Sequence, residues 1–161
     1  MGKFERMMKA AVSIKSAELE SKRRKFEKLP MFHKAGVYYS TKLEGVRDQT
    51  NLQVKVFAFQ IIRREANLEY ELGNYDRACR KYEEALCIFK YFLCLNPKWN
   101  EEGINDADLQ EYEELGKSDK EKLELVKLKL QMYLNIAACN VKTKEYDVAG
   151  QACDEALKLD P

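Results

Sequence analysis

The first 28 residues carry apolar side chains at helical spacing. One stripe of a helix over residues 3–28 would consist of Phe4, Met7, Met8, Ala11 and Ile14. Beyond Ile14 the stripe thins to Leu19 and Phe26, beside the basic run KRRK at 22–25. Because the residue before a proline disfavours the helical conformation, Pro30 is expected to end this helix.

Residues 31–52 show only weak periodicity and contain Gly36 and Gly45. Such a pattern is typical of a linker or an irregular packing segment. We therefore expect residues 1–52 to form an N-terminal amphipathic helix and linker, followed by a domain at 53–161.

From residue 53 the pattern becomes strongly helical. One helix is predicted to run into Gly73, a residue suited to the left-handed position after a helix. A second helix is predicted from Tyr75 through the apolar run CIFKYFLCL at 87–95, ending near Asn96-Pro97.

The acidic segment 98–117 follows, with a short helix expected at 107–115. Ser118 and Glu121 have the spacing of a capping box, in which the hydroxyl and the carboxylate each accept from the other residue's backbone N–H. This box is expected to open a long helix that extends to about Lys144. A last helix is predicted over 147–159.

Two segments of the chain repeat each other at a constant offset. Tyr75, Ala78, Tyr82, Ala85 and Leu86 recur as Tyr146, Ala149, Cys153, Ala156 and Leu157. Small and large side chains alternate on one helix face in both copies, which lets a neighbouring helix approach closely. The repetition therefore predicts two similar units of packing.

The chain resembles the tetratricopeptide repeat (TPR), an antiparallel helix hairpin with a period of about 34 residues. With Gly73 at the turn, the first repeat spans about 59–92, the insertion about 93–127 and the second repeat about 128–161. Signature positions hold Ala66, Ala78, Tyr82, Ala85, Tyr133, Ile136, Ala137, Ala149, Cys153, Ala156 and Pro161. The resemblance implies an all-α fold of antiparallel TPR helix hairpins with an N-terminal helical extension.

The sequence departs from the TPR pattern at three positions. Glu65 and Glu69 stand where the first helix is usually apolar, and Lys144 replaces the turn glycine of the second repeat. A narrower resemblance is to the TPR domain of FKBP-type immunophilins and of the aryl-hydrocarbon-receptor-interacting class of co-chaperones. In those domains both helices around the insertion are long, as we predict here.

The narrower resemblance implies a peptide site. In that family, the concave groove binds the acidic C-terminal peptide of a cytosolic heat-shock chaperone through a carboxylate clamp. The matching positions here are Arg63, where the family has Lys, together with Asn67 and Asn135. The expected groove neighbours are Gln60, Tyr70, Gln131 and Ala138.

The clamp chemistry is plausible for these residue types. A guanidinium offers a two-pronged donor and an asparagine amide offers a neutral donor, and a terminal carboxylate needs several such donors. Alternatively, Arg63 and Arg64 form a solvated face, while Asn67 and Asn135 bond to neighbouring backbone. The chain ends at Pro161 without a third repeat, so a further repeat or a partner chain is expected to cover that end.

Charge is balanced overall but segregated along the chain. The net charge is +1, while residues 1–28 hold nine Lys and Arg against four Glu, and residues 101–124 hold ten Asp and Glu against three Lys. Solvated faces are the favoured interpretation, and contacts with partners the alternative. The balance argues against nucleic-acid binding.

The sequence offers no enzyme motif and no metal or cofactor site. The five Cys lie in apolar helical patterns typical of a reducing compartment, and the single His has no ligand cluster beside it. The pairs Glu83-Glu84 and Glu113-Glu114 are expected on exposed helix surface. No run is long enough to span a membrane.

Two functions remain, both cytoplasmic and both dependent on protein partners. The first is a co-chaperone adaptor that uses the clamp. The second is a structural TPR scaffold in a larger assembly, for example a cytoskeletal or axonemal one.

Overall fold

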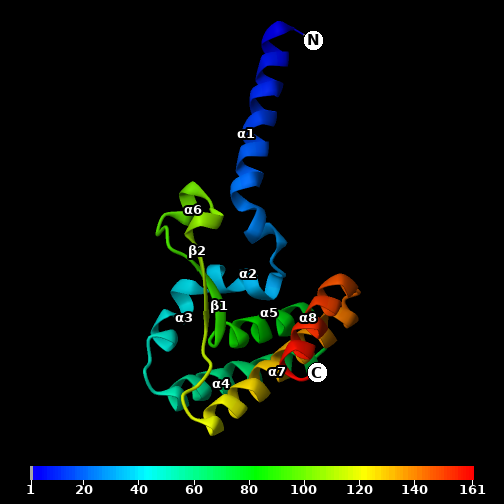
Figure 1. Cartoon of the computed structure of the whole chain (residues 1–161). Helices are drawn as coiled ribbons and strands as arrows, with labels where there is room; N and C mark the ends of the chain where they lie inside the picture. The colour runs from blue at the N-terminus through cyan, green and yellow to red at the C-terminus, as the bar shows by residue number, and fades with distance from the viewer. Residues whose placement is uncertain (1) are drawn as a thin grey trace. The chain divides into compact units, whose positions relative to one another are not determined.

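The computed structural model describes residues 2–161 and is mostly helical (Figure 1). Within these residues the chain forms eight α-helices, one 3₁₀ turn and a two-stranded sheet. It divides into two compact units: one comprises the residues up to Leu29 together with Cys94–Gln110, and the other comprises Pro30–Leu93 and Glu111–Pro161. The expected domain boundary at 52/53 does not coincide with this division.

The smaller unit is built around α1 (Lys3–Lys28), which confirms the helix expected there. It also contains α6 (Trp99–Glu102) and the 3₁₀ turn η1 (Asp106–Asp108). The Asp106 carboxylate accepts hydrogen bonds from the backbone N–H groups of Lys25 and Phe26, at 2.7 and 3.0 Å. This aspartate therefore fixes η1 against the end of α1.

The larger unit contains two helix hairpins. The first joins α4 (Leu52–Glu71) to α5 (Tyr75–Leu86), and the second joins α7 (Asp119–Lys142) to α8 (Tyr146–Leu159). α5 packs against α7, so the two hairpins share one core. Its largest fully buried side chains include Phe59, Leu86, Ile88, Phe89, Leu125, Met132, Tyr133 and Ile136.

The capping box predicted at Ser118 and Glu121 is confirmed. The Ser118 hydroxyl accepts from the Glu121 N–H at 3.2 Å, and the Glu121 carboxylate accepts from the Ser118 N–H at 3.3 Å. Backbone bonds to its carboxylate hold the pKa of Glu121 below its usual range. The carboxylate therefore stays ionised at the helix N-terminus, where negative charge is favourable.

The two hairpin turns have the same hydrogen bonding. In the first, the N–H of Asn74 donates to the carbonyl of Glu69 at 2.9 Å; in the second, the N–H of Glu145 donates to the carbonyl of Asn140 at 2.8 Å. These partners are related by the same offset that relates the repeated packing residues in the sequence. The repetition thus extends from packing residues to the backbone that closes each hairpin.

Residues 31–52 were expected to be a linker or an irregular packing segment, and most of them form two short helices that pack on the hairpins. They are α2 (Met31–Tyr38) and α3 (Ser40–Arg47). Buried Phe32, Val37 and Leu43 supply the reason, because each loses contact with water when these short helices pack on the hairpins. Most of α2 is buried, rather than one stripe of it. Its sequence therefore lacks the periodic pattern of an amphipathic helix, and the helix was not predicted.

The segment 87–95, expected to continue a helix, was also predicted wrongly. α5 ends at Leu86, and residues 90–94 form strand β1 (Lys90–Cys94), paired with β2 (Leu109–Glu113). The pairing is antiparallel, with Tyr91 stacked on Tyr112 at a ring distance of 5.4 Å. β2 and η1 likewise replace the short helix expected at 107–115.

Arg47 ties α3 to the segment that follows α5. Its guanidinium donates to the carbonyls of Cys87 at 3.0 Å and Gly36 at 3.3 Å, and lies 3.7 Å from the centre of the Tyr91 ring. This arginine is buried although it carries a charge. Carbonyl acceptors and an aromatic face partly replace the water it has lost.

Candidate functional site

The structure brings four of the seven predicted site residues into one hollow. Asn67 and Tyr70 of α4 and Asn135 and Ala138 of α7 line a cavity of about 320 Å³, which we call the α4/α7 hollow. Its remaining lining residues are Glu71 and Tyr82. The first helices of the two hairpins therefore contribute to a single concave surface.

α4 and α7 run side by side in the same direction. Gln53 near the start of α4 donates to Glu124 near the start of α7 at 3.4 Å. Farther along, the Arg63 guanidinium donates to the Gln131 side-chain oxygen, also at 3.4 Å. Hydrogen bonds of this length are weak. They show how the two helices are aligned, but they add little to the stability of that arrangement.

Asn67 is held by a neighbour that sequence reasoning had assigned only to packing. The Tyr82 hydroxyl of α5 donates to the Asn67 side-chain oxygen at 2.5 Å. Burial raises the pKa of Tyr82 to about 12, so the phenol stays protonated and keeps donating at neutral pH. The Asn67 amide N–H₂ group is then available as a donor to a ligand in the hollow.

Arg63, Gln60 and Gln131 lie earlier in α4 and α7 than the residues that line the hollow, and outside that lining. Arg63 Nε and Gln60 Oε1 are buried atoms without a hydrogen-bond partner among the described residues. A ligand or a water molecule would supply a partner to such atoms. Arg63 is one helical turn from Asn67, on the same face of α4.

Glu71 is the charged member of the lining, and the sequence prediction missed it. It lies four residues after Asn67, so it shares a face of α4 with that asparagine. That spacing was readable in the sequence. A glutamate here disfavours a carboxylate ligand, because the two negative charges would repel each other.

The pair Glu83-Glu84 is buried, contrary to the expectation of an exposed charge run. The two residues are only 5% and 4% exposed. Glu84 is paired with Lys42 of α3 at 2.8 Å. The packing of α2 on α5, together with this ion pair from α3, explains the difference, because α2 and α3 were not predicted.

No group of three or more His, Cys, Asp or Glu side chains within residues 2–161 is arranged to hold a metal ion. Over the same residues, each helix is either too short or too polar to cross a membrane.

No protein-family model matches the chain, and no solved structure gives a significant match.

Proposed function

We propose that the chain is a TPR adaptor of the co-chaperone type. Its α4/α7 hollow would receive the acidic C-terminal peptide of a cytosolic heat-shock chaperone. The observation that carries this proposal is the meeting of Asn67 and Asn135 in one hollow. The repeated turn hydrogen bonding supports the TPR arrangement of the two hairpins.

In the proposed binding mode, neutral side-chain amides rather than charged groups bind the end of the peptide. The Asn67 and Asn135 amides would donate to the terminal carboxylate, and Arg63 would bind an acidic side chain farther along the peptide. Hydrogen bonds to a charged group contribute about 1.5–3 kcal/mol each. The repulsion from Glu71 offsets part of that, so the isolated chain is expected to bind weakly.

Isothermal titration calorimetry tests the proposal with one peptide in two forms. A peptide ending in Glu-Glu-Val-Asp with a free carboxylate should bind more tightly than the same peptide with a C-terminal amide. Equal affinities, or no heat from either peptide, would refute the clamp. Raising the salt concentration should weaken the acid form more than the amide form.

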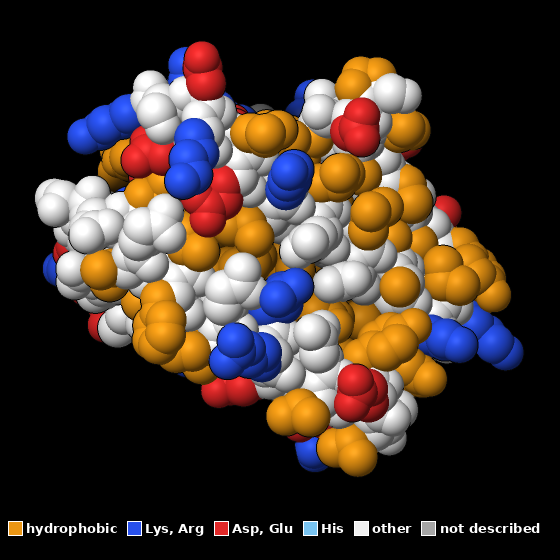
Figure 2. All heavy atoms as spheres, turned by 90° about the horizontal axis from the view of Figure 1, so that it is seen from below, with side chains coloured by type: hydrophobic (Ala, Val, Ile, Leu, Met, Phe, Trp, Pro, Cys, Tyr) orange, Lys and Arg blue, Asp and Glu red, His pale blue; other side chains and the backbone are white. Residues whose placement is uncertain are grey.

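An exposed apolar stripe on α4 favours the second candidate, a structural scaffold. Phe57 and Leu68 lie in α4, and Leu72 is the residue that follows its last turn. These three residues are 69%, 61% and 75% exposed. Figure 2 views the molecule from below, the side of α4 and α7, and shows several groups of hydrophobic side chains there with Lys and Arg between them. Permanent contacts in an assembly would cover such a surface. A negative peptide titration would favour this candidate.

A further inference from the structure

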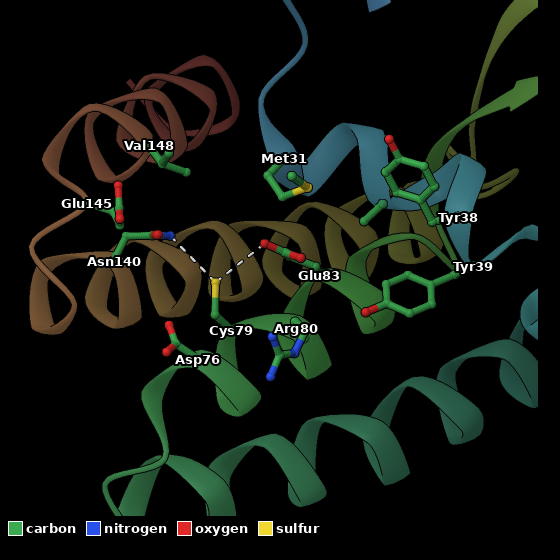
Figure 3. Close-up of a pocket in the computed structure, with 11 residues that line it drawn as sticks. Met31, Tyr38, Tyr39, Asp76, Cys79, Arg80, Glu83, Asn140, Glu145 and Val148 are labelled. Carbon is green, nitrogen blue, oxygen red and sulfur yellow. Dashed lines mark hydrogen bonds between the residues drawn. The ribbon is translucent and has the colours of Figure 1, made fainter. Parts of the chain in front are cut away.

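A second and larger cavity lies within the same unit, bounded by residues of α2, α5, α7 and α8. Its volume is about 560 Å³, within the range typical of small-molecule sites. Figure 3 shows Met31 and Tyr38 of α2, Glu83 of α5 and Val148 of α8 around it. We call it the Glu83 cavity. It shares no lining residue with the α4/α7 hollow.

Glu83 is a buried carboxylate with no ion-pair partner in the part of the chain that the structure describes. Its side chain lines the cavity, yet the residue is only 5% exposed. Among the described residues, its hydrogen-bond donor is the Cys79 thiol, a weak donor, at 3.5 Å. Within residues 2–161 Glu83 forms no ion pair, whereas the adjacent Glu84 is paired with Lys42 and Lys81. A buried charge ordinarily requires such a partner.

The thiol that faces Glu83 is itself fixed in place. The Asn140 side-chain N–H₂ group donates to the Cys79 sulfur at 3.6 Å and to the Ile136 carbonyl at 2.8 Å. The neighbouring Cys139 thiol, burial and the Glu83 carboxylate raise the pKa of Cys79. The thiol therefore stays protonated and donates to Glu83; the dashed lines in Figure 3 mark this bond and the one from Asn140. Asn140 and Cys79 hold Glu83 in position but supply no positive charge.

The other charged groups around the cavity are mostly negative. Asp76 of α5 and Glu145 before α8 add two carboxylates, and Arg80 of α5 adds one cation. Arg80 is exposed and forms no ion pair with Glu83 in the described chain. The neutral polar groups that face the site include the Tyr39 phenol and the Cys79 thiol. Net charge here therefore favours a cationic ligand.

The remaining walls are apolar or aromatic. Met31, Ala35 and Val148 contribute hydrocarbon and thioether surface, and the rings of Tyr38 and Tyr39 lie nearby. An anionic ligand would be repelled by Glu83, and a wholly apolar ligand would leave the carboxylate unpaired. A ligand with a protonated nitrogen on an apolar body satisfies both the carboxylate and the walls.

We propose that the Glu83 cavity binds a small amphiphilic amine, with the protonated nitrogen against Glu83 and the apolar body against Met31 and the two tyrosines. Burial raises the pKa of Glu83 to about 7. Binding of a cation favours the ionised carboxylate, so amine affinity rises as the pH rises through 7. Between pH 6 and pH 8 the increase should be about tenfold, because the ionised fraction of Glu83 grows by that factor.

The test compares three six-carbon probes on the wild-type chain at pH 8: hexylamine, hexan-1-ol and hexanoate. Binding is followed by titration of the ¹³C-labelled Met31 methyl resonance, which reports on this cavity. Hexylamine should bind at least about tenfold more tightly than hexan-1-ol, because only the amine pairs with Glu83. Hexanoate should give no shift. Equal binding of amine and alcohol, or no shift with any probe, would overturn the proposal.

A pair of variants adds a matched control. Glu83→Gln preserves the shape of the side chain and should reduce hexylamine affinity to that of hexan-1-ol. Glu84→Gln removes the neighbouring carboxylate, which faces Lys42, and should leave the amine preference intact. Persistence of the preference in Glu83→Gln would contradict the proposal. If Glu83→Gln does not fold, the pH dependence of the wild type decides: a constant amine affinity between pH 6 and pH 8 would overturn the proposal.

Discussion

Gly73 and Lys144 occupy the same position in the two hairpin turns, and both have positive φ. The angles are 80° for Gly73 and 64° for Lys144. A residue with a Cβ atom is strained in this region by roughly 1 kcal/mol, whereas glycine adopts it freely. The second hairpin therefore has the same turn geometry as the first, although its turn residue is lysine rather than glycine.

Lys144→Gly should stabilise the chain. Removal of the strained conformation outweighs the extra freedom that glycine gives to the unfolded chain, by about 0.5–1 kcal/mol. Urea denaturation measures the free energy of unfolding. Gly73→Ala is the matched control and should destabilise by a similar amount, although nothing within 4 Å would contact its new Cβ atom. A loss of stability in Lys144→Gly would contradict the argument.

Gly36→Ala should destabilise the larger unit by about 1–3 kcal/mol, because of crowding rather than backbone strain. An added Cβ would lie 2.9 Å from the backbone nitrogen of Phe92 and 2.9 Å from the Tyr91 Cβ, so α2 and β1 would have to separate. Gly45→Ala in α3 is the control. Its Cβ would contact nothing within 4 Å, and alanine favours a helix, so this change should stabilise. Thermal unfolding of both variants checks the contrast.

His33 should remain neutral down to mildly acidic pH. It is buried and lies 3.2 Å from the Tyr133 hydroxyl, and burial lowers its pKa to about 4. Nearby Lys90 and Lys158 lower the pKa further, while Glu155 and Glu113 oppose them. His33 is the chain's single histidine, so its Cε1 proton is easily identified by NMR. That resonance should not move between pH 7.5 and pH 5.5.

The lowered pKa of His33 makes the free energy of unfolding depend on pH. The unfolded chain has the ordinary His pKa near 6.5 and binds the proton more readily than the folded chain. The contribution of His33 is therefore complete above pH 6.5 and is lost as the pH falls through about 4. The loss is about 3 kcal/mol for this group alone. His33→Gln should weaken the dependence on pH in this window, and an unchanged slope would contradict the assignment.

Asn67→Ala should weaken binding of the acid-ended peptide about tenfold or more, because one donor to the carboxylate is lost. Binding of the amidated peptide should change little. The Tyr82 hydroxyl also loses its acceptor, so a stability loss of about 1 kcal/mol is expected without unfolding. Asn100→Ala, in exposed α6, is the control and should leave both affinities unchanged. Equal weakening of both peptides would indicate a general packing effect.

Glu71→Gln should strengthen binding of the acid-ended peptide. It removes the negative charge that lines the α4/α7 hollow, while the side chain keeps its size. The gain should be severalfold at low salt and should shrink as salt is added. Glu101→Gln, in exposed α6, provides the comparison and should have no effect. An unchanged affinity in Glu71→Gln would exclude a carboxylate bound in this hollow.

Elements with strong local signals were predicted correctly from the sequence. The stripe from Phe4 to Ile14, the left-handed turn at Gly73 and the capping box at Ser118 each depend on residues close together in the chain. Local spacing was also enough to place Asn67 and Asn135 on the two helices that line one hollow. The TPR assignment and the clamp stay predictions.

The errors occurred where long-range packing decides the structure. The run 87–95 is apolar and short, so helix and strand were both compatible with it until its pairing with β2 was known. Glu83 and Glu84 were expected at the surface, because nothing local shows that α2 and α3 cover them. For the same reason the cavity beside Glu83 had no signature in the sequence.

The hydrogen bond between His33 and Tyr133 bears on the order in which the larger unit assembles. It joins residues 100 positions apart, whereas the hairpin turns close through bonds between near neighbours in the chain. Closing a long loop costs more entropy and slows folding, so the hairpins should form early and α2 should dock last. Helix α2 contributes one wall of the Glu83 cavity, so the cavity would be complete only after both hairpins have formed.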